Sequence, residues 1–363
     1  MKKAIAAFLF LVLCYSLAEA QQLIGGRAAG MGGAGVAATD DMSAAYYNPA
    51  ALMRSEAKVF ETKVDLGAAY TDLNTLGKVL GDSNDPSKFL LDNYHNNLNF
   101  NGSLNGIVGL SVRKVGISVI PFLATNVNKP AETLGGSVTA GGHYDAALTL
   151  GTTYSVPFLP ASLDVGVNLK SINGINGTIT ATQSQANSFE ATGTQTYGTG
   201  SGTGFDIGAL TTVNVPYVTK VAVGAVIRNI AASYTLGNTS KTAYMNFQTG
   251  TTTFGAETAT NQTVNLDSST AVGAYTVVPG LGLGIAADIE MTKTDTNTHI
   301  GLEYPMLLGL LVLRAGVASG PNLSLTTAGA ELNLKVFKLD LVTVADAKNT
   351  GLTNTVVDMT FAL

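Results

Sequence analysis

The chain has 363 residues, of which 46% are hydrophobic and only 12% are charged. Its 20 basic and 25 acidic residues give a net charge of −5, which excludes the basic footprint of a nucleic-acid-binding protein. Its single cysteine excludes a disulfide framework, and its three histidines lack metal-ligand spacing, so we expect no metal and no cofactor.

Residues 1–20 have the pattern of a Sec signal peptide. Lys2 and Lys3 form a positive start, residues 4–13 are apolar, and residues 18–20 (Ala-Glu-Ala) make a small-x-small cleavage site. The segment is too short for a membrane anchor, and it contains the single cysteine. We therefore expect export and a cysteine-free mature chain with a net charge of −6.

Residues 21–57 are rich in glycine and alanine and fit neither a strand nor a stable helix. The segment does not alternate, and each glycine between Gly25 and Gly35 costs a helix about 1 kcal/mol relative to alanine. Small residues pack closely, and Asn48-Pro49 favours a turn, so we predict a compact plug. The polar residues available to bond to the surrounding protein are Arg27, Asp40, Asp41 and Asn48.

Residues 58–363 contain fourteen segments in which apolar side chains occupy alternate positions. In the sixth segment, Phe205, Ile207 and Ala209 share one face, and Asp206 and Gly208 share the other. Period two over about 9–12 residues fits a tilted membrane-spanning strand. The segments are residues 58–70, 104–113, 115–126, 142–156, 161–175, 203–215, 219–236, 264–278, 281–292, 297–304, 309–318, 323–333, 335–345 and 353–363.

The lengths of the connections decide between a soluble β protein and a transmembrane barrel. Connections after even-numbered segments are short, such as the Arg113-Lys114 corner. Those after the first, third, fifth and seventh are long and polar, and we expect residues 176–202 and 237–263 to be solvated surface loops. Short turns at one end, long loops at the other and an even strand count are typical of outer-membrane barrels. We predict an all-β fold, a 14-stranded antiparallel transmembrane β-barrel formed by residues 58–363, with the N-terminal plug in its lumen.

The inward faces of these strands are expected to carry glycine, alanine and charges of both signs. Pairing the ninth, tenth and eleventh strands through their short connections, with Pro305–Leu308 as one turn, places Glu290, His299 and Arg314 side by side on the inner wall. Such a triplet resembles catalytic machinery, but opposite charges on adjacent strands stabilise a sheet without any catalytic role. We favour a charge ladder that faces the plug.

Two stretches of the sequence resemble one family of membrane proteins. The first comprises Arg27, Gly30-Met31-Gly32-Gly33-Ala34, Asp40-Asp41, Asn48-Pro49-Ala50 and Leu52, and it is similar to the N-terminal hatch of the FadL superfamily of outer-membrane proteins. That superfamily includes fatty-acid and aromatic-hydrocarbon transporters and the PorV-like proteins of secretion systems. The second stretch, Gly301-Leu302-Glu303-Tyr304 with Leu313-Arg314-Ala315-Gly316, is similar to a late hairpin of PorV-like members. The resemblance covers roughly 60 residues and implies a monomeric barrel with a hatch in its lumen.

The resemblance also implies where a ligand enters and leaves. Residues 73–98 have apolar side chains at helical spacing and predict short amphipathic helices, which either cap the barrel rim or build an external hydrophobic groove. The candidate ligand contacts in that groove are Leu76, Leu80, Phe89, Leu90 and Tyr94. Pro121 cannot donate to a strand ladder and predicts a kink, either a lateral opening in the wall or a rim irregularity.

Three functions are compatible with this architecture. We favour outer-membrane transport of small hydrophobic molecules, of the long-chain fatty acid or hydrocarbon type, by passive diffusion through the hatch-plugged barrel. The alternative is a PorV-like outer-membrane scaffold for the secretion or surface attachment of other proteins, without transport. A general aqueous porin is disfavoured by the plug. The sequence has no nucleophile elbow, phosphate-binding loop or dinucleotide-binding turn, so we do not expect an enzyme. The expected partners are outer-membrane lipid, a hydrophobic ligand and, for a scaffold, surface or periplasmic proteins.

Overall fold

The computed structural model describes residues 23–57, 59–72, 74–75, 78, 90–155, 161–184, 189–215, 219–349 and 351–363. The predicted signal peptide lies outside these residues. The strands are β1 (Glu61–Tyr70), β2 (Leu98–Val112), β3 (Val115–Lys129), β4 (Gly136–Ser155), β5 (Ser162–Gln183), β6 (Glu190–Val215), β7 (Thr219–Asn246), β8 (Thr251–Phe254), β9 (Thr258–Asn265), β10 (Ser269–Val277), β11 (Gly284–Met291), β12 (Thr296–Met306), β13 (Leu311–Ser319), β14 (Ser324–Asn333), β15 (Phe337–Asp346) and β16 (Thr353–Ala362). Helices α2 (Gly26–Gly30), α3 (Ala44–Tyr47) and η1 (Pro49–Ala57) precede β1, and η2 (Leu307–Gly309) joins β12 to β13.

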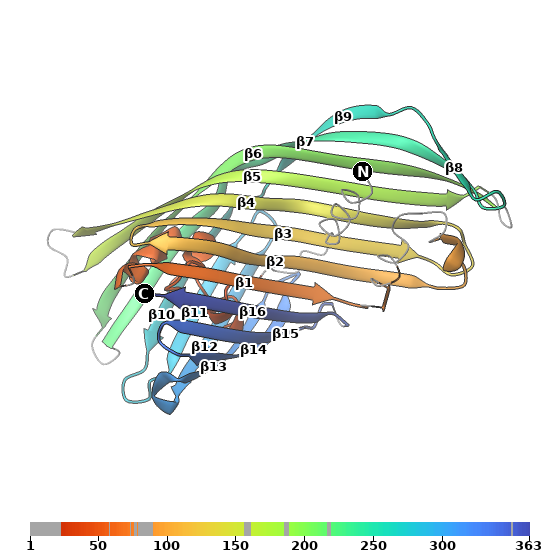
Figure 1. Ribbon diagram of the computed structural model, residues 1–363. Coiled ribbons are helices and arrows are strands. Elements are labelled where there is room, and N and C mark those ends of the chain that lie inside the picture. Colours follow the sequence, from red (N-terminus) through yellow and green to blue (C-terminus); the bar gives the residue numbers. More distant parts are fainter. Residues whose placement is uncertain are drawn as a thin grey trace.

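The strands form one antiparallel sheet that closes on itself. β1 pairs with β16 on one side and with β2 on the other. Along β7, residues 221–228 pair with β10, residues 233–240 with β9 and residues 243–246 with β8. These three strands therefore share one position in the wall, and the sixteen strands make fourteen positions (Figure 1). The predicted 14-stranded antiparallel β-barrel is confirmed.

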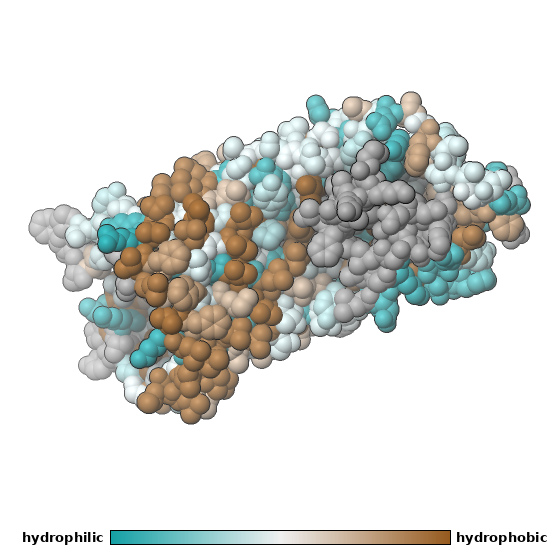
Figure 2. Space-filling view, in the orientation of Figure 1, coloured by the Kyte–Doolittle hydropathy of each residue, from teal (hydrophilic) through white to brown (hydrophobic). Residues whose placement is uncertain are grey.

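Alternation separates a lipid-facing surface from the lumen. In β13, Leu313 and Val317 point outward and are 43% and 46% exposed, whereas Arg314 and Gly316 between them are buried. Figure 2 shows apolar side chains gathered over the part of the barrel near the short turns, while the surface farther along the strands is mainly polar. An outward apolar band of this kind is the membrane-spanning surface of a β-barrel. Among the helices of the described residues, none has the length and apolar character needed to cross a membrane.

Several strands extend the sheet beyond this apolar band. β5, β6 and β7 have 22, 26 and 28 residues, and about 9–11 suffice to cross a membrane. The described parts of residues 176–202 and 237–263 are mostly strand, so the expectation of solvated loops there is wrong. Threonine is β-branched and favours strands even in a polar segment, and each extension pairs with the next hairpin over its whole length. Polarity in these stretches reflects one solvated face and not the absence of a strand, since residues such as Ala191 and Met245 are buried on the other face.

Residues 23–57, here called the lumen segment, lie inside the barrel (Figure 1). Ile24, Met31, Met42 and Leu52 are completely buried. The segment approaches the wall closely where the wall has glycine. A Cβ added to Gly316 of β13 would lie 2.2 Å from the backbone nitrogen of Gly32, and one added to Gly166 of β5 would lie 2.2 Å from the carbonyl carbon of Pro49. The small inward residues of the wall therefore match the small residues of the segment.

Candidate functional site

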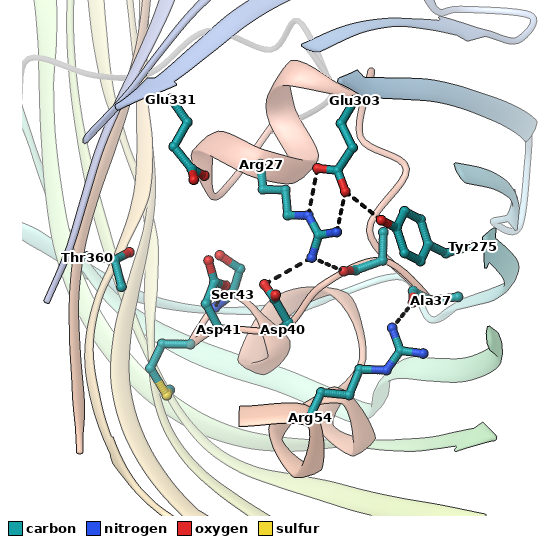
Figure 3. A network of polar contacts seen from close by, with 12 residues as sticks. Arg27, Ala37, Asp40, Asp41, Ser43, Arg54, Tyr275, Glu303, Glu331 and Thr360 are labelled. Atoms are coloured by element: carbon teal, nitrogen blue, oxygen red, sulfur yellow. Dashed lines mark hydrogen bonds and ion pairs between the residues drawn. The ribbon is translucent and has the colours of Figure 1, made fainter. Parts of the chain in front are cut away.

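Arg27 of α2 connects the lumen segment to the wall. Its guanidinium Nε donates to Oε2 of Glu303 on β12 at 3.0 Å, and Nη1 lies 3.0 Å from Oδ1 of Asp40 (Figure 3). Tyr275 of β10 donates its hydroxyl to Oε1 of Glu303 at 2.6 Å. Burial lowers the pKa of Arg27, but the carboxylates of Asp40 and Glu303 more than offset this and raise it above its ordinary value. Arg27 is therefore a permanent cation held between the segment and β12.

Arg314 of β13 extends this network along the wall. It binds Glu303 at 3.3 Å and Glu331 at 2.6 Å, and it also contacts the carboxylate of Asp340. One arginine thereby pairs with carboxylates from β12, β14 and β15, and it shares Glu303 with Arg27. The arrangement is a buried structural network, because every one of these groups is paired within the protein.

The predicted triplet of Glu290, His299 and Arg314 is wrong in one member. His299 Nε2 lies 3.9 Å from Oε2 of Glu290, so these two are neighbours as expected. Arg314 pairs across from Glu303 instead, while His299 faces Ala318. The prediction took Pro305–Leu308 as the turn, but Pro305 belongs to β12 and the turn begins at Leu307. Moving the turn by two residues changes the β12–β13 register by four.

A second network lies at β1 and β16, on another side of the lumen segment. Lys63 Nζ is 2.8 Å from Oδ2 of Asp41 and also contacts the carboxylate of Asp358. Asp358 accepts a hydrogen bond from the backbone nitrogen of Gly26 at 2.6 Å, and Asp65 accepts one from Gly25 at 3.0 Å. The sequence reasoning missed Lys63 and Asp65. Their alternation with outward apolar residues in β1 is the signal that marks them as inward-facing.

The glycine motif of the lumen segment packs on β12 to β14. Thr327 Oγ1 accepts a hydrogen bond from the nitrogen of Gly32 at 3.0 Å and donates one to the carbonyl of Gly30 at 2.9 Å. His299 Nδ1 lies 2.8 Å from the carbonyl oxygen of Gly32. A Cβ added to Gly33 would lie 2.9 Å from the same imidazole nitrogen, and Met31 is fully buried against Gly301 of the wall. The motif therefore specifies close backbone contact with the wall.

Asn48 is the centre of the Asn48-Pro49-Ala50 turn. Its side chain is completely buried, and its Nδ2 donates to the carbonyl of Val36 at 3.0 Å and to that of Ala209 on β6 at 3.1 Å. Its Oδ1 accepts a hydrogen bond from the nitrogen of Ala50 at 3.1 Å. Asn48 thus closes the turn and joins two parts of the lumen segment to the wall at once.

A cavity of about 400 Å³ lies between the lumen segment and the wall strands. One side of it is aromatic. The ring of Tyr46 is 6.1 Å from that of Phe122, which is 4.8 Å from the imidazole of His143, and Tyr234 continues the row at 5.8 Å from His143. These four side chains, here called the aromatic row, lead from α3 through β3 and β4 to β7, and the first three of them line the cavity.

The lining of the cavity also carries paired charges, next to the aromatic rings. Lys170 Nζ lies 2.9 Å from Oδ1 of Asp206 and 3.4 Å from Oδ2 of Asp145, and Arg228 Nη2 lies 2.6 Å from Oε1 of Glu290. With Asp267, the lining has four carboxylates and two cations. The cavity is therefore amphipathic and acidic in balance. Among the described residues, no group of three or more His, Cys, Asp or Glu side chains is arranged to hold a metal ion.

The predicted ligand contacts of the long first loop lie elsewhere. Leu76, Leu80 and Phe89 fall outside the described residues. Leu90 is 6% exposed and packs in an apolar cluster that Tyr94 also contacts. Other members of that cluster are Leu98, Phe100, Val127, Leu134, Ala181, Ala191, Met245 and Phe247. The cluster lies where strands project beyond the apolar band and in the connections between them. Neither Leu90 nor Tyr94 is among the described residues lining the 400 Å³ cavity.

Pro121 lies at an irregularity in the wall. The β2–β3 ladder pairs Asn105 with Phe122 and Val108 with Val119, and no pairing is formed between these two points. Buried residues of β3 are even-numbered up to residue 120 and odd-numbered from residue 123, so the strand changes faces at the proline. Proline has no N–H to donate, which accounts for the interruption on this strand.

The neighbouring strands are distorted at the same level. Gly106 of β2 has a φ of 153° and Gly142 of β4 has a φ of 132°, values that other residues rarely adopt. A Cβ at Gly106 would lie 2.1 Å from the carbonyl oxygen of Asp65, and one at Gly142 would lie 2.1 Å from that of Phe122. The irregularity thus crosses β2, β3 and β4, and Phe122 of the aromatic row lies on it.

These observations define the class of the protein as a transmembrane β-barrel whose lumen is occupied by its own N-terminal segment. No protein-family model and no curated protein matches the sequence. Solved structures match over nearly the whole chain. The Pseudomonas putida toluene transporter TodX is 11% identical, with 93% of this chain and 97% of that chain covered and a TM-score of 0.59.

Two further structures give the same result. The Ralstonia pickettii toluene transporter TbuX is 14% identical, with 93% and 97% of the two chains covered and a TM-score of 0.54. A Pseudomonas aeruginosa FadL homologue is 10% identical, with 96% and 98% covered and a TM-score of 0.56. The chain therefore has the fold of the FadL-type channels.

Proposed function

We propose that the protein lets small hydrophobic molecules, of the hydrocarbon or long-chain fatty acid type, diffuse passively across the outer membrane. The observation that carries this proposal is the cavity of about 400 Å³ with its aromatic row. Cavities of roughly 300–1,000 Å³ with aromatic walls are typical binding sites for small ligands. The fold shared with toluene transporters supports the same function.

In this proposal the lumen segment acts as the hatch. It lies across the route from the cavity to the short-turn end of the barrel, and Tyr46 belongs both to the segment and to the cavity lining. The segment packs against the wall through apolar residues such as Ile24 and Leu52, and it is also anchored by ion pairs and hydrogen bonds, such as those of Arg27 and Asn48. Such contacts can exchange with water when the segment shifts.

The proposed exit is through the wall at Pro121. The interrupted β2–β3 ladder reduces the number of hydrogen bonds that a local separation of the two strands would break. Phe122 brings the aromatic row to the same point. A ligand that left there would pass directly into the membrane.

A scaffold for other proteins is the second candidate. The paired extensions of β5, β6 and β7 beyond the apolar band favour it, because they present a large polar surface on the side away from the short turns. In that case the cavity would have no ligand, and the extensions would bind secreted or surface proteins in the PorV-like manner.

Transport into vesicles distinguishes the two functions. The protein would be reconstituted into liposomes, and uptake of labelled toluene and of labelled oleate would be measured for the wild type, Phe122→Ala and Phe254→Ala. Phe254 is an exposed residue of β8, outside the cavity, and serves as the matched control. We expect uptake above that of protein-free vesicles, and a loss of roughly tenfold for Phe122→Ala alone, because an aromatic contact contributes about 1 kcal/mol or more. Uptake of neither compound by correctly folded protein would favour the scaffold.

A further inference from the structure

The β12–β13 turn presents leucine side chains at the short-turn end of the barrel. Leu307 is 67% exposed, Leu308 is fully exposed, and Leu310 is 43% exposed. The sequence from Tyr304 to Leu313 contains no charged residue. A soluble turn at this place would be polar, so the apolar composition requires an explanation.

The backbone of this turn does not favour leucine. Leu307 has a φ of 49° and Leu308 a φ of 60°, and Gly309 follows with a φ of 85°. Glycine or asparagine adopts left-handed conformations more easily than leucine does. The turn geometry therefore does not select these side chains, and their apolar character is consistent with a contact outside the chain.

Neighbouring turns continue the same surface. The nitrogen of Asn333 donates to the carbonyl of Leu310 at 2.8 Å, which joins this turn to the β14–β15 corner, and Gly282 of the β10–β11 turn lies next to Pro305. The apolar side chains exposed on the three turns, here called the apolar rim, are Leu281, Leu307, Leu308, Leu310, Leu334 and Val336. The membrane-facing residues of β12 and β13, such as Leu302 and Leu313, continue directly into it.

One other turn at this end of the barrel is different in character. The β2–β3 turn consists of Arg113 and Lys114, both exposed. Lys335 lies within the apolar rim, between Leu334 and Val336, and a lysine can extend its ammonium to the headgroups from such a position. One side of the short-turn end is thus apolar and another is basic.

We propose that the apolar rim lies within the hydrocarbon region of the membrane, so that the barrel is inserted obliquely with the β10–β15 side deeper. Bilayer lipid is the occupant that the observations favour, because the rim is continuous with the lipid-facing band. Figure 2 shows this apolar surface running from the band to the end of the barrel without a polar boundary on this side. The basic β2–β3 turn on the other side would then remain among the headgroups.

Tryptophan fluorescence tests this placement, because the chain contains no tryptophan of its own. Three single substitutions are compared: Leu308→Trp in the rim, Val317→Trp in the band, and Lys114→Trp in the basic turn. Each is folded into phosphatidylcholine vesicles with and without brominated acyl chains. We expect the brominated lipid to quench the fluorescence of Leu308→Trp about as strongly as that of Val317→Trp, and the fluorescence of Lys114→Trp far less. The emission maximum of Leu308→Trp should also be blue-shifted.

Two results would overturn the proposal. If Leu308→Trp has the same emission maximum and the same weak quenching as Lys114→Trp, the rim lies in water. A blue-shifted maximum without quenching by brominated lipid, or one that depends on the protein-to-lipid ratio, would assign the rim to a protein contact, such as a second copy of the chain. Folding of each variant is checked by its heat-modifiable mobility in gels, and Leu307→Trp replaces Leu308→Trp if the latter does not fold.

Discussion

Arg27 and Glu303 join the lumen segment to β12 by two parallel hydrogen bonds, the longer of which spans 3.0 Å from Nε to Oε2. The same carboxylate accepts a hydrogen bond from Tyr275 on β10 and another from Arg314 on β13. Through one side chain the segment is therefore held against three strands. If the segment is a hatch, this pair is the contact whose strength sets how often the hatch moves.

Removing the cation should loosen the segment without unfolding the barrel. For Arg27→Met we expect a loss of about 1–3 kcal/mol in the local stability of residues 23–57, because Glu303 keeps its bond to Arg314 but loses two others. Hydrogen exchange of those residues should accelerate by roughly tenfold or more, with exchange in the strands unchanged. Lys241→Met is the control, since Lys241 forms a partly exposed pair with Glu257 at 3.7 Å, away from residues 23–57. Equal effects of the two substitutions would contradict the anchoring role.

The glycine contacts predict a steric effect at the same interface. Gly316→Ala places a methyl group 2.2 Å from the nitrogen of Gly32, which cannot yield without moving the segment. The probe is a cysteine introduced by Met31→Cys, which we expect to be unreactive toward a maleimide when the rest of the chain is wild type. In the Gly316→Ala background we expect the same cysteine to react with the maleimide. The chain has no cysteine beyond residue 14, so labelling of the processed protein is specific. Gly237→Ala, whose added Cβ has no neighbour closer than 3.9 Å, should leave Met31→Cys protected.

The barrel could be predicted from sequence because its signal is repeated fourteen times. Period-two alternation fixes which face of each strand meets lipid, and a turn such as Arg113-Lys114 fixes the register of its hairpin. Where a turn was placed two residues too early, at Pro305, the alternation stayed correct but Arg314 was assigned the wrong partners. A shift by an even number of residues leaves every side chain on its predicted face, so periodicity alone cannot detect it.

The site was less predictable than the wall. Asn48 and Arg27 stood out as polar residues in a small-residue segment, but their partners, Ala209 and Glu303, are far away in sequence. The aromatic row combines residues of α3, β3, β4 and β7 that share no motif. The long extensions of β5 to β7 were missed because their threonine, glycine and asparagine residues have the composition of a loop, although each strand buries small or apolar residues such as Ala191 and Met245 on one face.

Of the two ligand types proposed, the balance of charge in the cavity favours the neutral hydrocarbon over the fatty acid, whose carboxylate is charged. Four carboxylates face two cations that are already paired, so a carboxylate ligand meets net repulsion. We expect the wild type to bind toluene more tightly than benzoate in a competition assay in detergent. Asp145→Asn should improve benzoate binding by up to about tenfold, since it removes one charge from a buried wall, and should leave toluene binding unchanged. Glu257→Gln, an exposed change outside the cavity, should have no effect, and benzoate binding equal to toluene in the wild type would contradict the argument.

The interrupted ladder at Pro121 predicts that a covalent link between β2 and β3 blocks passage. Val108 and Val119 are directly paired beside the gap and point outward, with exposures of 54% and 44%, so a disulfide between cysteines at these positions fits the spacing of paired strands. We expect the oxidised Val108→Cys/Val119→Cys protein to take up toluene several-fold more slowly than the same protein after reduction. The matched pair is Leu341→Cys/Val357→Cys, which faces outward on β15 and β16 in a continuous part of the ladder, and its oxidation should not change uptake. If both pairs slow uptake equally, the effect is general stiffening of the barrel. If neither does, ligand leaves by another route, and the distortion shared by β2, β3 and β4 is only an accommodation of the proline within the wall.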